Sequence, residues 1–407
     1  MEYLSPGVYV EETPSAAKPI AGVSTSTPVF ISIIPDTVQL IARGDPAVDK
    51  TPTKLVNQSL PPSKAIGFYT NWSQFAAAFG GLSGDSATKA STAAGAAVNS
   101  NQHNLALAVY GYFDNGGSRC YAVRASNMGD LAGALSGLEA VDDISLVVAP
   151  GLIDEPTRSA ITAHCAVATG DRFAIFDGPQ SAPDIKMLAA PGRTDYAAMY
   201  FPWIKVFDPS AQLAGGTGVV AVPPSGHIAG VYARVDQTRG VHKAPANEVI
   251  HGALGVSQAL SKADQAGLNP AGINCLRSLN GNIVVWGART VGGDLNADLK
   301  YVNVRRTLIF LRKSIEEGTQ WIVFEPNTAP LWQKINRNVT AFLTSVWRAD
   351  ALFGDTAKDA FYVKCDAETN PPASRDNGLV VTEIGVALAR PAEFVIFRIS
   401  QMSGSGG

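Results

Sequence analysis

The glycine-rich segment Gly216–Ala221 comes closest in this sequence to a cofactor-binding motif, since its spacing matches G-x-G-x-x-A. In a dinucleotide site such glycines let the backbone approach a pyrophosphate at the N-terminus of the helix that follows. Here Pro223 and Pro224 follow at once, and proline disrupts the interior of a helix. We therefore expect no nucleotide site at this segment. The phosphate-loop, nucleophile-elbow and zinc-protease motifs do not occur in the sequence.

The other residues that could carry chemistry are scattered along the chain. His164 and Cys165 are neighbours in an amphipathic stretch, and adjacent helical residues point to different sides, so a shared metal is not expected. The acidic pairs Asp142–Asp143 and Glu316–Glu317 fit loop and helix-end positions better than acid–base catalysis. The remaining histidines are His103, His227, His242 and His251. We expect no catalytic residue, no cofactor and no metal.

Composition limits the class of protein. A chain of 407 residues predicts two or three domains. Charged residues make up 16% of the chain, well below the roughly 25% that is usual for a globular domain, so much of its surface is expected to be covered in use. The net charge of −3 gives no reason to expect nucleic acid or an anionic membrane as a partner.

Cysteine usage and the first residues favour synthesis and folding in a reducing cytoplasm. The chain begins without the basic and apolar regions of a signal peptide, and no apolar run reaches membrane-spanning length. The cysteines have no C-x-x-C spacing and are predicted to be small buried apolar residues. They are Cys120, Cys165, Cys275 and Cys365.

Two strand-like runs stand at the ends of the chain. Pro14 and Pro19 separate the first run from the body, and Pro391 precedes the second. Because neither run has a hairpin partner beside it in sequence, each must pair with a distant strand, in this chain or in another. The residues of these runs are Val8, Tyr9, Val10 and Glu11 at one end and Phe394, Val395, Ile396, Phe397, Arg398 and Ile399 at the other.

The first part of the chain mixes predicted strands and helices. Residues 144–149 and 172–176 are predicted buried strands on either side of the amphipathic stretch 157–169, a β–α–β pattern. Asn71 is predicted to cap a helix that ends at Gly80. The other expected elements are strands over 27–35, 65–69 and 120–124, a helix over 105–113 and a loop region over 35–63.

From about residue 246 the pattern changes. Asn280-Gly281 predicts a tight hairpin between strands 273–276 and 283–286. Two helices are expected over 299–317 and 329–353, with a strand over 321–324 between them. Further strands are expected over 361–363 and 379–384.

The helix expected over 329–353 is predicted to bury one face and to expose a basic one. At about 100° per residue, its apolar residues fall on one arc. They are Leu331, Ile335, Val339, Phe342, Leu343 and Val346. Lys334, Arg337 and Arg348 fall together on the opposite side. A solvated face and a partner-binding face are equally good interpretations of this pattern.

Several motifs, in order along nearly the whole chain, resemble those of contractile tail sheath proteins, the family shared by phage tails, R-type bacteriocins and extracellular contractile injection systems. The most specific stretch is PPSGHIAGVYAR, residues 223–234, which continues through residues 239–247. The similarity is weakest over 37–63 and 82–101. The other similar stretches are 5–12 (SPGVYVEE), 112–121, 200–203, 268–270, 286–290, 301–306 and 324–327.

The resemblance implies a two-domain subunit of mixed α+β and α/β class. A tube-facing domain with a mixed sheet would combine an N-terminal arm, residues 1–22, with residues 246–390. An outer α/β domain would be inserted as residues 23–245, and residues 391–407 would form a C-terminal arm strand and tail. In this family the terminal strands are exchanged between neighbouring subunits, which would give both end runs their partners.

The resemblance also implies a structural function without enzymatic activity. Subunits would polymerise as helically stacked six-fold rings around an inner tube, in a metastable sheath whose contraction drives the tube through a target envelope. The implied partners are further copies of the chain, the inner tube protein, and baseplate and cap proteins, with no nucleic acid and no direct membrane insertion. Lys334, Arg337 and Arg348 are the candidate tube-facing residues. The assembled particle would be a phage tail or an injection particle, the latter released from the cell in some systems.

Two alternatives stay open at this point. One is another self-assembling tail component, such as a tube or terminator protein. The other is an α/β enzyme, suggested by the β–α–β pattern and by the glycines of residues 215–218, and disfavoured because no polar residues stand at catalytic spacing.

Overall fold

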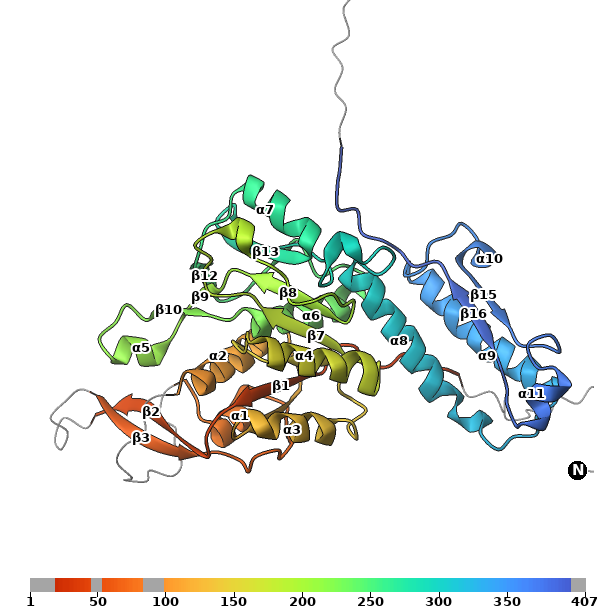
Figure 1. Cartoon of the computed structure of the whole chain (residues 1–407), viewed down its shortest axis with the longest axis horizontal. Coiled ribbons are helices and arrows are strands. Elements are labelled where there is room, and N and C mark those ends of the chain that lie inside the picture. Colours follow the sequence, from red (N-terminus) through yellow and green to blue (C-terminus); the bar gives the residue numbers. More distant parts are fainter. Residues whose placement is uncertain (1–18, 45–52, 83–98, 397–407) are drawn as a thin grey trace, which may run out of the picture. The chain divides into compact units, whose positions relative to one another are not determined.

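The computed structural model describes residues 19–44, 53–82 and 99–396, and Figure 1 labels most of its elements. The chain divides into two compact units. The large unit contains the described residues of 24–310 and 389–396, and the small unit contains residues 19–23 and 311–388. The division falls within helix α8 (Val302–Thr319), and strands from both sides of residue 245 share one sheet.

A mixed sheet forms the centre of the large unit. Its strands lie in the order β11-β14-β13-β8-β7-β6-β1-β5-β4. The pairs from β13 across to β5 are parallel, and antiparallel pairs stand at both edges. The strands are β1 Pro28–Ile33, β4 Gly67–Tyr69, β5 Cys120–Ala125, β6 Leu146–Val148, β7 Phe173–Asp177, β8 Ala197–Phe201, β11 Glu248–Val249, β13 Ile273–Leu279 and β14 Asn282–Trp286.

Helices cover both faces of this sheet, because successive residues of its strands point to opposite sides. Phe30 of β1 belongs to a core shared with α2 and α6, whereas Val29 and Ile31 belong to a core shared with α3 and α4. The helices are α1 Trp72–Phe79, α2 Ser100–Asp114, α3 Leu131–Leu138, α4 Glu155–Ala163, α5 Pro209–Leu213, α6 Ser225–Arg239 and α7 Lys262–Leu268. A π-helical turn spans His164–Thr169, and 3-10 turns span Met128–Asp130, Ile185–Met187, Asn269–Ala271 and Gly293–Leu295.

Several local predictions are confirmed. The predicted β–α–β pattern is present as β6, α4 and β7, and the two strands pair in parallel. Asn71 caps α1, its side-chain oxygen accepting a hydrogen bond from the backbone N–H of Gln74. Asn280 and Gly281 join β13 to β14 with φ values of 51° and 82°, the left-handed backbone that a two-residue hairpin turn requires.

Helices α2 and α6 approach each other so closely that no side chain fits between them at two positions. A Cβ atom at Gly226 would overlap the backbone of Ala108, and one at Gly230 would lie 2.6 Å from the carbonyl oxygen of Tyr112. Glycine is therefore required at both positions. Their spacing, one turn apart on α6, lies within the stretch 223–234 that most resembles the sheath family.

The region predicted to be a loop over residues 35–63 is instead a hairpin of β2 (Thr37–Arg43) and β3 (Thr53–Ser59). Val38, Leu40 and Ala42 are buried on one side of β2, but the surrounding Pro, Asp and Thr residues masked this alternation in the sequence. A further three-stranded sheet has the order β10-β9-β12, formed by Val219–Val222, Ile204–Phe207 and Ala253–Val256.

The small unit is built on the last part of α8, on α9 (Ala329–Arg348) and on a two-stranded ribbon. The ribbon pairs β15 (Phe361–Lys364) with β16 (Glu383–Val386), so the strand expected over 379–384 begins later than predicted. The strand expected over 321–324 was wrong: Gln320–Ile322 forms a 3-10 turn, and Phe324 has a φ of 71°, incompatible with a strand. Two short helices are α10 Ala357–Ala360 and α11 Pro372–Asp376.

Across the described ranges, no helix combines the length and the apolar character needed to cross a membrane.

Candidate assembly site at the roots of the chain ends

The predicted arm strands are only partly within the described residues. Val8, Tyr9, Val10 and Glu11 lie outside them, as do Phe397, Arg398 and Ile399. Phe394, Val395 and Ile396 are described, and they expose 73%, 68% and 80% of their surface. No strand pairing involves these three residues within the part of the chain that the structure describes. Three consecutive apolar side chains therefore stand open to solvent.

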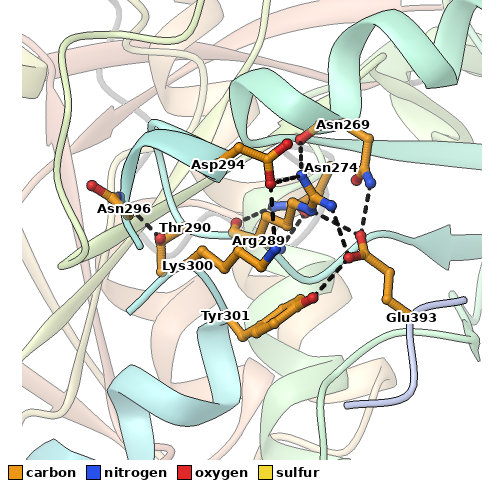
Figure 2. Close-up of polar contacts among 9 residues, drawn as sticks. All are labelled: Asn269, Asn274, Arg289, Thr290, Asp294, Asn296, Lys300, Tyr301 and Glu393. Atoms are coloured by element: carbon orange, nitrogen blue, oxygen red, sulfur yellow. Dashed lines mark hydrogen bonds and ion pairs between the residues drawn. The ribbon is translucent and has the colours of Figure 1, made fainter. Parts of the chain in front are cut away.

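Glu393, the residue just before them, is held firmly to the large unit (Figure 2). Arg289 donates from Nε and Nη2 to the two carboxylate oxygens, both at 2.8 Å. Asn269 Nδ2 donates to Oε1 at 2.7 Å, and the Tyr301 hydroxyl donates to Oε2 at 2.9 Å. The donors come from the ends of three different elements: the 3-10 turn after α7, the segment after β14 and the residue before α8. We call this cluster the Glu393 clamp.

Arg289 is itself fixed from several directions. Its backbone N–H donates to Asn274 Oδ1 at 2.7 Å, and Asn274 Nδ2 donates back to its carbonyl at 2.8 Å. Its Nη1 donates to the carbonyl of Asn269 at 3.1 Å and to Asp294 Oδ1 at 2.9 Å. Lys300 Nζ also reaches Asp294, at 3.3 Å. The guanidinium group of Arg289 is thus held in one orientation and has two carboxylate partners.

Charge stabilises the clamp. Burial alone would raise the pKa of Glu393, but the hydrogen bonds from Arg289, Asn269 and Tyr301 together outweigh it and lower that pKa below its usual value. Burial likewise would lower the pKa of Arg289, and Glu393 and Asp294 together raise it. The clamp therefore holds an ionised carboxylate at neutral pH.

Two further contacts hold the segment that leads to Glu393. Asn303 Nδ2 donates to the carbonyl of Ala389 at 3.2 Å. The exposed Arg390 lies 3.6 Å from Asp298, which is exposed as well. The root of the C-terminal segment is therefore attached at three points, of which Glu393 is the last.

A second arginine–carboxylate pair holds the first residues of the large unit in place, and we call it the N-terminal root. Arg306 Nη1 and Nη2 donate to the two oxygens of Asp236 at 3.0 and 2.6 Å. Thr25 joins the pair twice, its hydroxyl donating to Asp236 at 2.6 Å and its carbonyl accepting from Arg306 at 2.8 Å. The guanidinium also lies 4.6 Å from the ring centre of Tyr232. Arg306 and Asp236 expose only 3% and 4% of their side chains.

Within the small unit, residues 19–23 lie along the end of α8. Ile20 is buried against Gly318. A Cβ atom added at Gly318 would lie 2.7 Å from Cγ2 of Ile20. The backbone N–H of Val23 donates to the Ser314 hydroxyl at 3.1 Å.

The predicted amphipathic character of α9 is confirmed. Its buried residues include the whole predicted apolar arc, together with Trp332 and Asn338. Lys334, Arg337 and Arg348 are exposed on the other side. Among the described side chains, none makes a hydrogen bond or ion pair with any of the three. What this basic face contacts in an assembly stays a prediction.

The β15–β16 ribbon is short, and no third named strand pairs with it in the described ranges. Phe353 donates its backbone N–H to the carbonyl of Ala387 just beyond β16, and Asn336 Nδ2 donates to the carbonyl of Val363 in β15. Tyr362 of β15 stands opposite Gly385 of β16, and its ring lies where a Cβ of residue 385 would be. A two-stranded ribbon is marginally stable by itself. Pairing with further strands would add to its stability.

The residues singled out in the sequence for possible chemistry have the following settings in the described ranges. The segment 216–221 leads from α5 into β10, and the next helix, α6, begins at Ser225, directly after Pro223 and Pro224. Burial lowers the pKa values of His164 and His227 to about 4, with Arg172 adding to the effect on His164, so both are neutral at pH 7. In the described ranges no group of three His, Cys, Asp or Glu residues could hold a metal. All four cysteines are buried and unpaired.

The residues that root the chain ends were not identified from the sequence as partners. Arg289 and Arg306 lie in stretches that resemble the sheath family, but their carboxylates are 104 and 70 positions away. The usable signals were an arginine inside a largely apolar segment and a lone glutamate at the start of an apolar run.

Most of the chain is similar to known proteins. Residues 125–291 match the family model of the phage tail sheath protein central domain, and residues 294–402 match that of the phage tail sheath C-terminal domain. A tail sheath protein of Burkholderia phage BcepMu is 25% identical over 287 residues, covering 64% of this chain. The chain spans less than two thirds of the length of the curated relatives it matches, 58% in that case.

Solved structures agree over nearly the full length. The sheath of an extracellular contractile injection system (PVC) in its contracted state superposes with a TM-score of 0.73 and 28% identity, covering 99% of both chains. The contracted helical sheath of the anti-feeding prophage (AFP) gives a TM-score of 0.71 and 28% identity, covering 98% of this chain and 99% of the other.

Proposed function

This chain belongs to the phage tail sheath family, and we propose that it is the structural subunit of a contractile sheath. It would polymerise as helically stacked rings around an inner tube and contract to drive that tube through a target envelope. The observation that carries the proposal is the pair of rooted chain ends. An apolar segment, Phe394–Ile396, stands exposed directly after a clamped residue, as a strand intended for a neighbouring subunit would.

The β15–β16 ribbon is the proposed acceptor for these strands. Backbone hydrogen bonds to its strands would provide the affinity, and the proline-containing segments between the arms and the body of the subunit would allow the arms to span the distance. Both arms, through Val8–Glu11 and Phe394–Ile399, would then connect each subunit to its neighbours. This arrangement agrees with the low content of charged residues, because a subunit contacted on many sides keeps little free surface.

The proposed partners are other copies of the chain, an inner tube, and baseplate and cap proteins at the two ends. The basic face of α9 is the proposed tube contact. Exposed ion pairs contribute only about 0.2–1 kcal/mol each, so many of them could set the register and still release together. Reversing two charges, Lys334→Glu with Arg337→Glu, should lower assembly on the tube and leave arm-mediated contacts intact. If the variant assembles on tubes with the wild-type yield and the wild-type salt dependence, this face of α9 is exposed to solvent and does not contact the tube.

We also propose that the subunit has no catalytic role and that contraction uses energy stored in a metastable extended sheath. No nucleotide loop is present in the sequence, and the described residues offer no group of three His, Cys, Asp or Glu that could hold a metal. Contraction that required nucleotide hydrolysis by the purified subunit would overturn this part of the proposal.

The central test is assembly by electron microscopy. The purified chain should form long tubes, whereas an enzyme would form a small closed oligomer. Val8→Pro removes a backbone donor from the N-terminal strand, and we expect a folded subunit that does not assemble. Removal of residues 394–407 should act in the same way. Normal tubes from either variant would contradict strand exchange.

A further inference from the structure

Glu393 lies at the border between the attached and the exposed part of the C-terminal segment. Four hydrogen bonds hold its carboxylate, while the next three side chains are mostly exposed. We propose that Glu393 is the positioning residue of the C-terminal arm: the Glu393 clamp fixes where and in which direction the arm leaves the subunit. This inference rests on the proposed function, because it assigns a task in assembly to the arm.

The clamp can set direction as well as position. A single hydrogen bond would leave the carboxylate free to rotate, but the parallel bonds from Arg289 restrict it to one plane. Asn269 and Tyr301 approach the two oxygens from other elements and fill further acceptor sites (Figure 2). The backbone at residue 393 is thereby oriented before any neighbour binds.

Orientation before capture makes assembly more favourable. If the first residue of the arm is free to move, its backbone loses conformational entropy when a neighbouring subunit binds the arm. If Glu393 is held by the clamp, that entropy has already been lost during folding. Restricting the backbone of one residue is equivalent to roughly a tenfold change in binding affinity. We therefore expect loss of the clamp to raise the critical concentration for tube formation roughly tenfold.

The clamp can be removed without leaving a buried charge unpaired. Arg289 would keep Asp294 and the carbonyl of Asn269 as partners, and Asp294 is 51% exposed. Ala389 would still be held by Asn303. A Glu393 variant should therefore fold, so its effect on the arm can be measured in an intact subunit.

The first experiment measures arm orientation in the full chain, below the concentration at which tubes form. Spin labels on cysteines introduced at Met187 and Ile396, both highly exposed and both in the large unit, report a distance distribution. We expect a narrow distribution in the parent and a broad one in Glu393→Gln and Glu393→Ala. Asp298→Asn is the matched control, since it removes an exposed carboxylate from Arg390 at the same root. An unchanged distribution in Glu393→Ala would overturn the proposal.

A pH series separates positioning from general structure. The charged or titratable groups around the Glu393 carboxylate are Arg289, Asp294, Lys300 and Tyr301. Protonation of Glu393 below pH 4.5 should broaden the distance distribution of the parent, whereas Glu393→Gln should already be broad and show no such step. Effects from the buried His164 and His227 would appear equally in both proteins. A step of equal size in Glu393→Gln would contradict the assignment.

Tube formation supplies the last comparison. Glu393→Gln should need roughly tenfold more subunit than the parent to form tubes, and Asp298→Asn should behave as the parent does. If the chain without residues 394–407 still forms tubes, the proposed function fails. If that truncation abolishes tubes while Glu393→Gln assembles at the parent concentration, only the positioning role fails.

Discussion

Arginine–carboxylate pairs hold both the N-terminal and the C-terminal segment of the large unit, but the surroundings of the two pairs differ. At the N-terminal root the Arg306–Asp236 pair is closed to solvent, and a backbone carbonyl and a tyrosine ring complete its surroundings. At the C-terminal root Glu393 keeps 19% of its side chain exposed, and Arg289 has a second, half-exposed carboxylate partner. The comparison teaches that burial and spare partners, rather than the ion pair itself, decide whether such a contact is permanent or removable.

The largest effect is expected at the N-terminal root. Asp236→Asn leaves the buried Arg306 without a charged partner, which should lower the free energy of unfolding by about 3–5 kcal/mol. Urea denaturation of the unassembled subunit measures this. A loss below about 1 kcal/mol would place this pair in the same class as the Glu393 clamp and would remove the contrast.

A smaller effect is expected for Glu393→Ala. Arg289 keeps Asp294, and the lost hydrogen bonds involve a partly exposed carboxylate, so unfolding should become easier by only about 1–2 kcal/mol. The same denaturation assay applies. A loss as large as that of Asp236→Asn would mean that the clamp is part of the core.

The contribution of Glu393 should also depend on pH. Because its pKa is lower in the folded subunit than in the unfolded chain, its stabilisation is present above the unfolded value of 4.5 and is lost as pH falls through the folded value. The stability difference between the parent and Glu393→Gln, measured at pH 7 and again near pH 3, should therefore shrink in acid. A difference that grew in acid would show that folding does not lower the pKa of Glu393.

The smallest effects are expected for Tyr301→Phe and Asp298→Asn. The first change removes one neutral donor from the clamp and keeps the arginine fork, which corresponds to about 0.5–1.5 kcal/mol. Asp298→Asn, which affects only an exposed pair, should stay at or below the lower end of that range. Thermal denaturation of both variants beside the parent ranks them, and equal losses would mean that the Tyr301 hydroxyl adds nothing to the clamp.

Local patterns in the sequence predicted much of the fold. The Asn71 cap, the Asn280-Gly281 hairpin and the amphipathic face of α9 each depend on residues a few positions apart, and all three are confirmed. The prediction of a strand over 321–324 was wrong, because these β-forming residues lie in and after the 3-10 turn that follows α8. The β2–β3 hairpin was missed because turn-forming residues surround its alternating apolar positions.

The roots of the chain ends could not be predicted in the same way. Each depends on partners distant in sequence that meet only when the sheet and α8 are in place, as with Glu393 and Arg289. No short-range period distinguishes Arg289 from any other arginine. The sequence resemblance indicated that the ends act in assembly, whereas the structure was needed to identify what holds them.

The contact between α2 and α6 has a mechanical consequence. Backbone lies against backbone at Gly226 and Gly230, so no side-chain rotamer can change there to let the helices slide or separate. This pair should make the large unit stiff under load. In the proposed sheath, a change of length would then come from movement between subunits and not from sliding of α6 along α2.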